Sequence, residues 1–394
     1  MKIVIPDKVS KTAAKIFNEK GLDVEQNTGV EADKIPKDAD AIVVRSYELH
    51  NLEINGNLKA IGRAGAGVNN IPIEKCTENG VVVFNTPGAN ANAVKELVIC
   101  SLLLASRDIV GGISWTASQK ESGDKIQELV EKNKKLFAGT EIMGKCLGVI
   151  GLGAVGIPVA NAASALGMNV IGHDPYISVE NAWKLSTSVE KADSMESLLA
   201  KSDYITLHVP LTSGTKGMIN KDAISRMKDG VKLVNFSRGE IVNSEDLKKA
   251  LDSGKVGKYI TDFPSYEILE AKNVVCVPHL GASTEEAEEN CAVMVSSQIM
   301  DFLKNGNISN SVNFPSCKLE RSGNGRITIV NKNIPGMIEK ITDILAKEKL
   351  NITGMINKSR DNIAYNIFNI DVNADDAIVE KLQNIEGIVK VRKV

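Results

Sequence analysis

The stretch Val149-Ile-Gly-Leu-Gly-Ala-Val-Gly156 decides the fold of this chain. It joins an apolar strand-like segment, Leu147–Ile150, to a helical segment, Val155–Leu166, and its glycines follow the GxGxxG pattern of dinucleotide sites. A second strand-like segment, Asn169–Gly172, leads to Asp174, about 20 residues beyond the glycines, where a carboxylate meets the adenosine ribose. The sequence therefore predicts a doubly wound domain that binds a dinucleotide.

Each glycine of this stretch has a physical task. Gly151 allows the tight turn, Gly153 lets the backbone approach the pyrophosphate, and Gly156 permits close packing of the helix on the sheet. The N-terminus of that helix then presents its free N–H groups to the phosphates. Asp174 favours NAD over NADP, because its carboxylate would repel a 2′-phosphate. The expected cofactor is NAD.

Strands and helices alternate on both sides of the glycine stretch. After it, apolar runs predict strands at Tyr204–Val209, Lys232–Phe236, Lys258–Thr261 and Val274–Val277, and a helix at Ser244–Asp252. Before it, we expect strands at Lys2–Ile5, Ala41–Val44 and Val81–Phe84, a helix capped by Ser10 that stops at Gly21, and a largely buried helix at Asn92–Arg107. This alternation is typical of parallel, doubly wound sheets.

The C-terminal part of the chain has a different order. Ser283-Thr-Glu-Glu286 is a capping box that opens a long helix to the neighbourhood of Lys304. Asn305–Gly325 is rich in Asn, Ser and Gly and lacks periodicity, which predicts a linker. Arg326–Val394 has the pattern strand, helix, strand, strand, helix, strand, which is the order of a ferredoxin-like domain.

The composition is that of an ordinary globular protein. Of the 394 residues, 43% are hydrophobic and 24% are charged, and the formal net charge is −2, so nucleic acid is not an expected partner. The six cysteines are scattered with no CxxC pair, which indicates free thiols in a reducing compartment. There is neither a signal-peptide pattern nor an apolar run long enough to span a bilayer. We expect a cytoplasmic protein with no membrane partner and no metal site.

Three polar side chains follow predicted strands of the dinucleotide domain. His279, one of four histidines, comes directly after a strand, Arg238 follows another, and Glu267 follows a third. The carboxyl ends of parallel strands meet at one edge of a sheet, where doubly wound folds bind ligands. An imidazole suits proton transfer, a neighbouring carboxylate stabilises its protonated form, and a planar guanidinium binds a carboxylate. The set fits the oxidation of a secondary alcohol that carries a carboxylate.

Several stretches resemble the D-2-hydroxyacid dehydrogenase family, and this resemblance covers nearly the whole chain. They are Gly62-Arg-Ala-Gly-Ala-Gly-Val-Asn-Asn70, Phe137-Ala-Gly-Thr-Glu-Ile-Met-Gly-Lys145, Gly151–Gly156, His208-Val-Pro-Leu-Thr212, Ser237-Arg-Gly239 and Pro278-His-Leu-Gly-Ala-Ser-Thr284. The resemblance implies that Arg238, Glu267 and His279 are the catalytic trio and that Asp262 holds the nicotinamide carboxamide. Glu267 is aligned by its spacing, because the residues between it and Asp262 depart from the family pattern. The expected cofactor contacts are Gly151, Gly153, Ala154, Val155, Gly156, Asp174, His208, Val209, Pro210, Phe236, Ser237, Arg238, Asp262, His279, Gly281 and Ala282.

Within the family, the resemblance is strongest to members that oxidise 3-phospho-D-glycerate to 3-phosphohydroxypyruvate, the first step of serine synthesis. Arg45 and Arg63 match the positions that hold the substrate phosphate, a task that guanidinium groups suit. The expected substrate contacts are Arg45, Ser46, Arg63, Ala66, Gly67, Val68, Arg238 and His279.

The resemblance also implies a division into domains. We expect an α/β chain with a flavodoxin-like substrate-binding domain (1–92 and 283–308), an inserted Rossmann-like NAD domain (93–282), a linker (309–324) and a ferredoxin-like βαββαβ ACT domain (325–394). Ile329-Val-Asn-Lys-Asn-Ile-Pro-Gly336 carries the resemblance to an ACT domain. It implies an amino-acid effector, with serine the candidate, at Asn331, Asn333 and Asn351, where Asn331 replaces the His of serine-inhibited members. A homodimer or homotetramer is expected.

Three other interpretations of these residues stay open. One is a regulator that only senses amino acids through the ACT domain, although that domain is a small share of the chain. The chain can be a reductase of another 2-oxo acid, such as glyoxylate, hydroxypyruvate or 2-oxoglutarate, in which case Arg63 has no phosphate to bind. It can also be a non-enzymatic NAD-sensing regulator, since corepressors use this fold. The intact set of Arg238, Glu267 and His279 argues against a sensor, which has no need of a proton acceptor.

Overall fold

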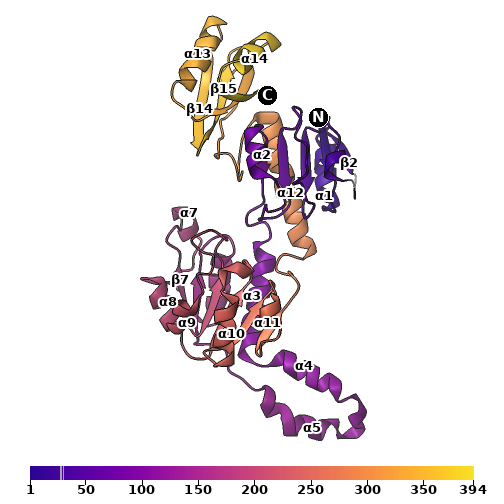
Figure 1. The fold of residues 1–394 in the computed structure, drawn as a ribbon, viewed down its shortest axis with the longest axis vertical. Coiled ribbons are helices and arrows are strands. Elements are labelled where there is room, and N and C mark those ends of the chain that lie inside the picture. Colours follow the sequence, from indigo (N-terminus) through magenta and orange to yellow (C-terminus); the bar gives the residue numbers. More distant parts are fainter. Residues whose placement is uncertain (27–28, 30) are drawn as a thin grey trace. The chain divides into compact units, whose positions relative to one another are not determined.

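The computed structural model describes residues 1–26, 29 and 31–394, which form two compact units (Figure 1). Unit 1 comprises Met1–Asn90 and Glu285–Val394, and unit 2 comprises Ala91–Thr284. Unit 2 contains a seven-stranded sheet, while unit 1 contains a five-stranded sheet and a four-stranded sheet. In sequence, unit 2 is therefore inserted between the two segments of unit 1.

The seven-stranded sheet of unit 2 is parallel, with the order β12-β11-β10-β9-β6-β7-β8. Its strands are β6 (Cys146–Ile150), β7 (Asn169–His173), β8 (Glu190–Lys191), β9 (Tyr204–Leu207), β10 (Val231–Asn235), β11 (Val256–Thr261) and β12 (Val274–Cys276). Every strand that the apolar runs predicted here is confirmed, with ends that differ by no more than two residues. Only β8 was missed, because this short edge strand is exposed and polar.

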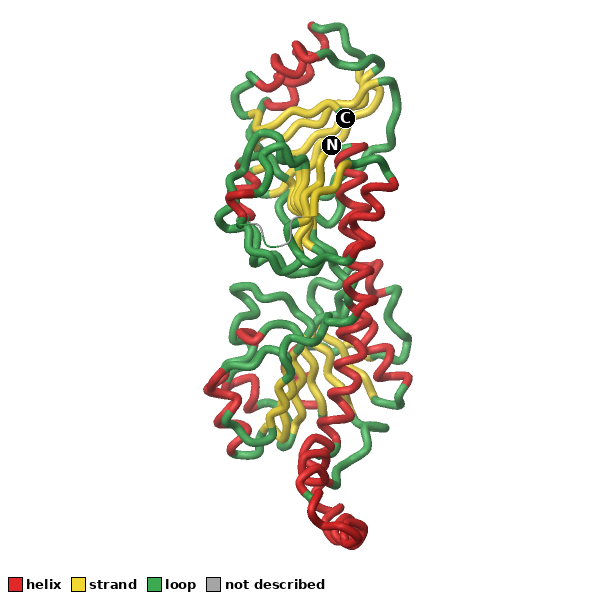
Figure 2. Tube along the Cα trace, turned by 90° about the vertical axis from the view of Figure 1, so that its right-hand side faces the viewer, coloured by secondary structure: helices red, strands yellow, loops and turns green. Residues whose placement is uncertain are grey.

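Most helices of unit 2 cover the two faces of this sheet (Figure 2). They are α3 (Ala91–Ser106), α4 (Ile109–Ser118), α5 (Ile126–Asn133), α6 (Gly156–Ala165), α7 (Val179–Ala182), α8 (Met195–Lys201), α9 (Lys221–Ser225), α10 (Ser244–Asp252) and α11 (Tyr266–Leu269), with the 3-10 turn η4 (Gly239–Ile241). α3 and α6 pack together, and Val98, Leu102 and Ala160 are fully buried between them and the sheet. α8 and α10 contribute the buried Leu198 and Leu247 to the core of the other face.

α4 and α5 are the exception among these helices. With the 3-10 turns η2 (Lys120–Lys125) and η3 (Lys134–Phe137), they form an arm that leaves the sheet of unit 2 (Figure 1). No residue in these four elements is buried, and Ile113 and Leu136 are 65% and 70% exposed. Among the described residues, no single helix has the length and hydropathy of a membrane span; α3 and α4, bent by 70°, have them only as a pair.

The five-stranded sheet of unit 1 is parallel, with the order β2-β1-β3-β4-β5, which is the doubly wound order of flavodoxin-like sheets. Its strands are β1 (Lys2–Ile5), β2 (Asp23–Gln26), β3 (Ala41–Val44), β4 (Ala60–Arg63) and β5 (Val82–Phe84). Around it lie α1 (Lys11–Glu19), α2 (Ile73–Glu78), α12 (Glu285–Asn305) and the 3-10 turn η1 (Ala32–Lys34). Ser10 caps α1 as predicted, since its hydroxyl accepts a hydrogen bond from the N–H of Thr12.

α12 packs against α1 and β4. Gly62 allows this approach, because a Cβ at that position would lie 2.4 Å from a side-chain carbon of Val295. The predicted capping box is wrong by one residue: α12 begins at Glu285, so Thr284 and not Ser283 precedes the helix. The Ser283 hydroxyl instead donates to the carbonyl oxygen of His279 at 3.3 Å. This bond joins the two ends of the loop 279–283.

Residues 306–324 form neither a helix nor a named strand, yet they are firmly attached to the edge of the parallel sheet. The N–H of Val312 donates to the carbonyl oxygen of Val83. The Asn313 side chain accepts from the N–H of Val83 at 2.8 Å and donates to the carbonyl oxygen of Val81 at 2.9 Å. The predicted linker therefore satisfies the free backbone groups of β5, an edge that would otherwise be open.

A four-stranded antiparallel sheet with the order β14-β15-β13-β16 completes unit 1. Its elements follow the predicted order: β13 (Gly325–Lys332), α13 (Met337–Lys347), β14 (Ile352–Arg360), β15 (Ile363–Ile370), α14 (Asp376–Gln383) and β16 (Ile388–Lys393). α13 and α14 cover one face. The other face packs on the end of α12, where the Tyr365 hydroxyl donates to the carbonyl oxygen of Gly306 and the Arg392 guanidinium lies 4.4 Å from the Phe302 ring.

Candidate active site

The glycine stretch forms the turn between β6 and α6, and its three glycines differ in their surroundings. Gly151 has a φ of 92°, and a Cβ there would lie 2.5 Å from the carbonyl oxygen of His208. A Cβ on Gly156 would lie 1.9 Å from the carbonyl oxygen of Gly151, whereas a Cβ on Gly153 would have no described atom within 4 Å. The fold thus requires glycine at 151 and 156, while the space at Gly153 is open, as an approaching pyrophosphate needs.

Asp174 follows β7, and its carboxylate fixes the glycine turn. Its Oδ2 accepts from the N–H of Leu152 at 2.8 Å, and its Oδ1 accepts from the N–H of Tyr176 at 2.9 Å. Later in the same turn, Ala154 is exposed and Val155 is half-buried. A carboxylate has about four lone-pair sites, so the anchored group keeps capacity for ribose hydroxyls. The position of Asp174 fits the role that its spacing predicted.

Five expected cofactor contacts follow β9 and β10 and lie side by side, because these two strands pair in parallel. They are His208, Val209 and Pro210 after β9, and Phe236 and Ser237 after β10. The Ser237 hydroxyl donates to the carbonyl oxygen of Leu207 at 2.7 Å and joins the two strand ends. Burial lowers the pKa of His208 to about 3, so this imidazole is neutral at physiological pH; its Nε2 lies 2.9 Å from the Thr206 hydroxyl.

Asp262 follows β11 and is 2% exposed. Its Oδ2 accepts from the N–H of Gly281 at 2.9 Å, next to the half-buried Ala282. Its Oδ1 is buried and has no hydrogen-bond partner among the described residues. Burial raises the pKa of the Asp262 carboxyl. A buried acceptor without a donor is costly, so Oδ1 fits the predicted contact with a nicotinamide carboxamide.

His279 and Arg238 both contact the aromatic ring of Phe263. The imidazole of His279 is 4.7 Å from the ring of Phe263, and the guanidinium carbon of Arg238 is 5.7 Å from it, measured between centres. His279 has a φ of 46°, which is uncommon outside glycine and frequent at functional sites. Arg238 is held by a bond from its Nη1 to the carbonyl oxygen of Ser237. The sequence did not single out Phe263, since only the fold shows what its ring contacts.

Among the described residues, no hydrogen bond or ion pair joins Glu267 to His279. A hydrogen bond with the Ser265 side chain lowers the pKa of Glu267, which is fully exposed. The reason is geometric: successive residues of a helix point about 100° apart, and α11 turns Ile268 into the core. Glu267 therefore faces solvent. Asp262 lies next to His279 instead: the backbone N–H of His279 donates to the backbone carbonyl oxygen of Asp262 at 3.1 Å.

In unit 1, Arg45 and Ser46 follow β3 in a turn that one carboxylate holds. The backbone N–H groups of Arg45, Ser46 and Tyr47 donate to Oδ2 of Asp7 at 2.8, 2.5 and 2.8 Å. Burial opposes ionisation of Asp7, but these backbone bonds prevail and lower its pKa. Because Asp7 takes all three N–H groups, only the side chains of this turn are available to a ligand.

The two predicted phosphate ligands are joined directly. Nε of Arg63 donates to the carbonyl oxygen of Arg45 at 2.9 Å. The Arg63 guanidinium lies over Gly65, where a Cβ would be 2.1 Å from Nη1. Nη1 of Arg45 forms an ion pair with Oε1 of Glu288 at 2.5 Å. The sequence pointed to both arginines, but Asp7 and Glu288 lie far away along the chain and had no local signal.

The predicted carboxylate-binding loop follows β4. Ala66 is exposed, and Gly67 and Val68 are half-buried. The carbonyl oxygen of Ala66 accepts from the Asn85 side chain, and that of Val68 accepts from the N–H of Ile71. None of the backbone N–H groups of 66–68 donates to a described residue. Three neighbouring free N–H groups suit an anion.

The predicted effector residues do not meet within one chain. β13 and β14 flank β15 and run parallel to each other, with Gly325 and Ile352 both opposite Ile370. Asn331 and Asn333 therefore lie at the end of β13, while Asn351, which precedes β14, lies at the opposite end of the sheet. Asn331 is 2% exposed and accepts from Asn366, whereas Asn333 is exposed and donates to the carbonyl oxygen of Asp361.

The comparisons with known proteins agree with this geometry. Residues 101–281 match the model of the D-isomer specific 2-hydroxyacid dehydrogenase NAD-binding domain. The whole chain is 32% identical to a D-3-phosphoglycerate dehydrogenase of Dictyostelium discoideum, over 97% of that protein. The chain belongs to the D-isomer-specific 2-hydroxyacid dehydrogenase family.

Other relatives cover less of this chain or are longer than it. D-3-phosphoglycerate dehydrogenases of Archaeoglobus fulgidus and Methanocaldococcus jannaschii are 38% and 39% identical over 80% and 82% of this chain, which spans only 60% and 61% of their length. The crystal structure of the NAD⁺-bound 3-phosphoglycerate dehydrogenase of Entamoeba histolytica is similar with a TM-score of 0.62 and 31% identity, over 79% of this chain and 98% of that one. NAD is thus the cofactor of the family's matched domain, in agreement with the open space at Gly153 and with Asp262 Oδ1, which has no partner in the described part of the chain.

Proposed function

We propose that this chain is an NAD-dependent dehydrogenase that oxidises 3-phospho-D-glycerate to 3-phosphohydroxypyruvate, the first step of L-serine biosynthesis. The names of its relatives, one of them similar over the whole chain, support this assignment. The observation that carries it is the linked pair of Arg45 and Arg63. The Arg63 side chain is bound to the backbone of Arg45, so one turn carries two guanidinium groups that can bind a phosphate, which an unphosphorylated acid does not need.

Unit 1 supplies the groups that bind the substrate. The side chains of Arg45, Ser46 and Arg63 bind the phosphoryl group, because Asp7 already occupies the backbone N–H groups of the first two. The free N–H groups of Ala66, Gly67 and Val68 bind the carboxylate.

Unit 2 supplies the groups that move protons and stabilise charge. A ring nitrogen of His279 takes the proton of the C2 hydroxyl, and Arg238 binds the carboxylate and stabilises the carbonyl oxygen that develops at C2. The glycine turn and Asp262 would hold NAD, which would supply the acceptor for the hydride of C2. Phe263 keeps the imidazole and the guanidinium in their relative orientation. Glu267 is proposed to stabilise the imidazolium once its exposed side chain has rotated toward His279.

The test is the rate of NADH formation with 3-phosphoglycerate beside D-lactate, D-glycerate and 2-hydroxyglutarate. The assay is run at alkaline pH with a carbonyl trap, because oxidation is uphill at neutral pH. A rate confined to the phosphorylated acid, with a KM that Arg63→Ala raises at least tenfold, supports the proposal. Equal rates with an unphosphorylated acid would assign the chemistry to another 2-hydroxy acid. No turnover with NAD still bound would favour a sensor.

The C-terminal sheet is proposed to be an ACT domain that binds an amino-acid effector, with serine the first candidate. Its βαββαβ order and the ladder of Asn331, Asn366 and Asn357 side chains support this. Because Asn351 lies at the other end of the sheet from Asn331 and Asn333, a site that uses all three needs two copies of the chain.

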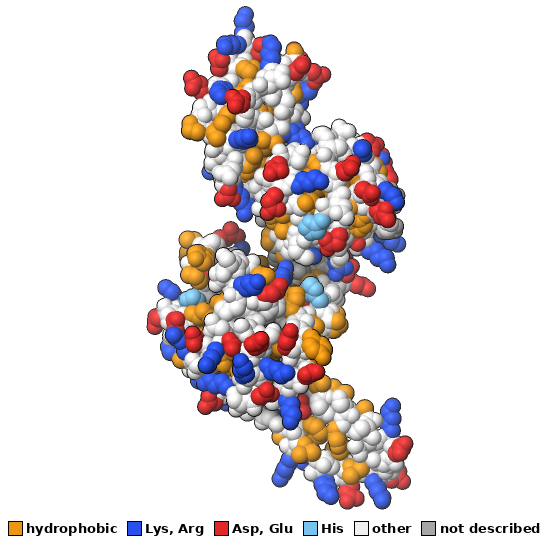
Figure 3. All heavy atoms as spheres, viewed as in Figure 1, with side chains coloured by type: hydrophobic (Ala, Val, Ile, Leu, Met, Phe, Trp, Pro, Cys, Tyr) orange, Lys and Arg blue, Asp and Glu red, His pale blue; other side chains and the backbone are white. Residues whose placement is uncertain are grey.

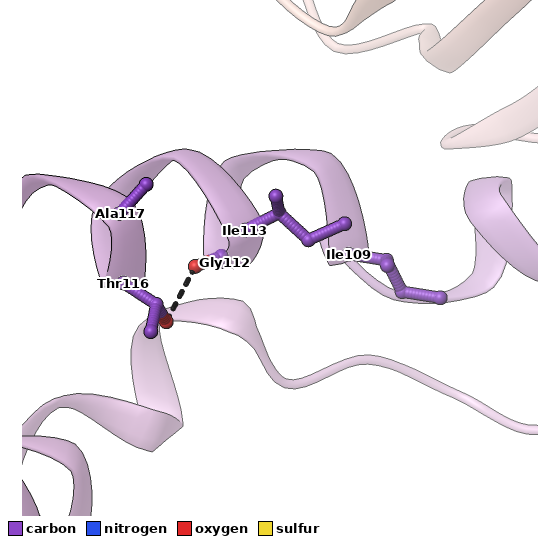
Figure 4. Close-up of a pocket in the computed structure, with 5 residues that line it drawn as sticks. All are labelled: Ile109, Gly112, Ile113, Thr116 and Ala117. Atoms are coloured by element: carbon purple, nitrogen blue, oxygen red, sulfur yellow. Dashed lines mark hydrogen bonds between the residues drawn. The ribbon is translucent and has the colours of Figure 1, made fainter.

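We further propose that the chain is a homodimer or homotetramer. The α4–α5 arm supports this, because it presents Val110, Ile113, Val130 and Leu136 to solvent. In Figure 3 apolar side chains gather along the arm, with acidic and basic side chains at its edges. Ile109, Gly112, Ile113, Thr116 and Ala117 line a shallow apolar depression on α4 (Figure 4).

The expected division into a substrate domain (1–92 and 283–308), an NAD domain (93–282), a linker (309–324) and a regulatory domain (325–394) is kept as a proposal. The five-stranded, seven-stranded and four-stranded sheets support it. A cytoplasmic location also stays a prediction; all six cysteines are free thiols, as a reducing compartment requires.

A further inference from the structure

The guanidinium group of Arg45 already has a partner. We infer that Glu288 is an internal competitor for Arg45, which weakens the binding of a phosphate monoester and so allows the phosphorylated product to leave. This inference rests on the proposed function, because it concerns the same phosphate site. It assigns Glu288, a residue of α12, to the control of substrate affinity.

The geometry fixes Arg45 from several sides. Its N–H is bound to Asp7, its carbonyl oxygen accepts from Arg63, and its Nη1 pairs with Oε1 of Glu288 at 2.5 Å. The Arg45 side chain therefore cannot turn to a ligand without changing its contact with Glu288. An incoming phosphate must share Arg45 with that carboxylate or displace it.

The ion pair is weak enough to be displaced. The side chains of Arg45 and Glu288 are 30% and 38% exposed, so water and salt screen their attraction. Glu288 lies in the first turn of α12, where the helix dipole stabilises a carboxylate that has lost its cation. A displaced Glu288 carboxylate is therefore stabilised by solvent and by the N-terminus of α12.

The two carboxylates that contact Arg45 differ in what neutralises their charge. Arg45 and Arg63 carry two positive charges, and Asp7 and Glu288 carry two negative ones. The charge of Asp7 is taken up by backbone N–H groups, but that of Glu288 acts directly on Arg45. A phosphate monoester is a dianion, so the repulsion from Glu288 is felt more by it than by an uncharged hydroxyl group in the same place.

Glu288→Gln removes the charge and keeps the shape and the hydrogen-bonding capacity of the side chain. Glu286→Gln is the matched control, because Glu286 is exposed in the same first turn and its loss affects the helix dipole equally. Thermal melting is followed during titration with inorganic phosphate at constant ionic strength, with saturating NAD so that the glycine turn is occupied. We expect the phosphate dissociation constant of Glu288→Gln to fall about threefold to tenfold, and that of Glu286→Gln to stay unchanged.

Steady-state kinetics give a second readout. The KM for 3-phosphoglycerate should fall by a similar factor in Glu288→Gln, while the KM for D-glycerate, which lacks the phosphate, stays the same. A double-mutant cycle with Arg45→Ala tests whether the effect of Glu288 passes through Arg45. When Arg45 is already alanine, Glu288→Gln should change neither the phosphate dissociation constant nor the KM for 3-phosphoglycerate. Weaker phosphate binding in Glu288→Gln would mean that Glu288 orients Arg45, and an equal gain without Arg45 would mean a general charge effect. Either result overturns the inference.

The phosphate titration also separates this inference from the proposed function. If the wild-type chain does not oxidise 3-phosphoglycerate, but Glu288→Gln tightens phosphate binding only when Arg45 is present, the competition stands and the substrate assignment fails. If the wild-type chain oxidises 3-phosphoglycerate, but Glu288→Gln changes neither the phosphate dissociation constant nor the KM for 3-phosphoglycerate, the function stands and the competition is refuted.

Discussion

The ring of Phe263 lies 4.7 Å from the imidazole of His279, with an angle of 49° between the two planes. The same ring lies beneath the guanidinium of Arg238. Phe263 thus connects the proposed base to the proposed carboxylate ligand, although these residues follow different strands of the sheet. Since His279 is exposed and its backbone adopts a left-handed conformation, this ring contact is a main restraint on its side chain.

Replacing Phe263 by alanine should lower kcat about tenfold while NAD binding is retained. An aromatic pair and an exposed cation–π contact together contribute about 1 to 2 kcal/mol, which corresponds to about tenfold in rate. Phe263→Tyr keeps the ring and should stay near the wild-type rate. Steady-state rates and NADH titrations of both variants provide the check, and equal rates for the two would show that the ring does not orient the site.

Gly153→Ala should separate cofactor binding from folding. A Cβ at Gly153 meets no described atom, so the melting temperature without cofactor should be unchanged, while the NAD dissociation constant should rise about tenfold or more. Gly151→Ala and Gly156→Ala place a methyl group against backbone carbonyl oxygens and should each cost about 1–3 kcal/mol or more of folding free energy. Thermal melting with and without NADH distinguishes the two classes. Normal NAD affinity in Gly153→Ala would contradict the proposed path of the pyrophosphate.

Local patterns were sufficient to predict most of the fold. Buried parallel strands are short apolar runs, so β6, β7, β9, β10, β11 and β12 were found within two residues of their ends. The short β8 is exposed and polar, and therefore carries no such signal. The capping box failed because Ser283 and Thr284 are adjacent and chemically alike, and only the turn geometry decides which one precedes α12.

The site was predicted less completely, for a different physical reason. Residues at strand ends, such as Arg238 and His279, could be grouped because parallel strands end at one edge. Phe263, Asp7 and Glu288 act through pairs distant in sequence, and a single residue's type does not reveal its partner. Glu267 was aligned by spacing alone, which does not fix the direction of a side chain on a short helix.

Asp262→Asn should raise the melting temperature of the cofactor-free protein at neutral pH. Burial raises the pKa of Asp262 in the folded protein. The contribution of this side chain to the free energy of unfolding is therefore largest below about pH 4, the ordinary pKa of Asp, and it is lost as the pH rises through the raised pKa. Asparagine removes that ionisation, so the gain over wild type should shrink as the pH falls toward 4. Melting curves at several pH values test this, with Asp193→Asn as the exposed control. A gain that does not depend on pH would refute the role of ionisation.

Glu267→Gln should move the acidic limb of the pH profile of kcat/KM for oxidation toward lower pH. If Glu267 stabilises the imidazolium of His279, then removing its charge makes the ring release its proton more readily. The exposed Glu270, which follows α11, offers a matched control, since Glu270→Gln removes the same charge nearby. His279→Ala should lose most turnover but keep NADH binding, which verifies that the limb reports His279. If the acidic limb of the kcat/KM profile is the same in Glu267→Gln and wild type, Glu267 stays exposed during turnover. Asp262 would then be the carboxylate that acts on His279.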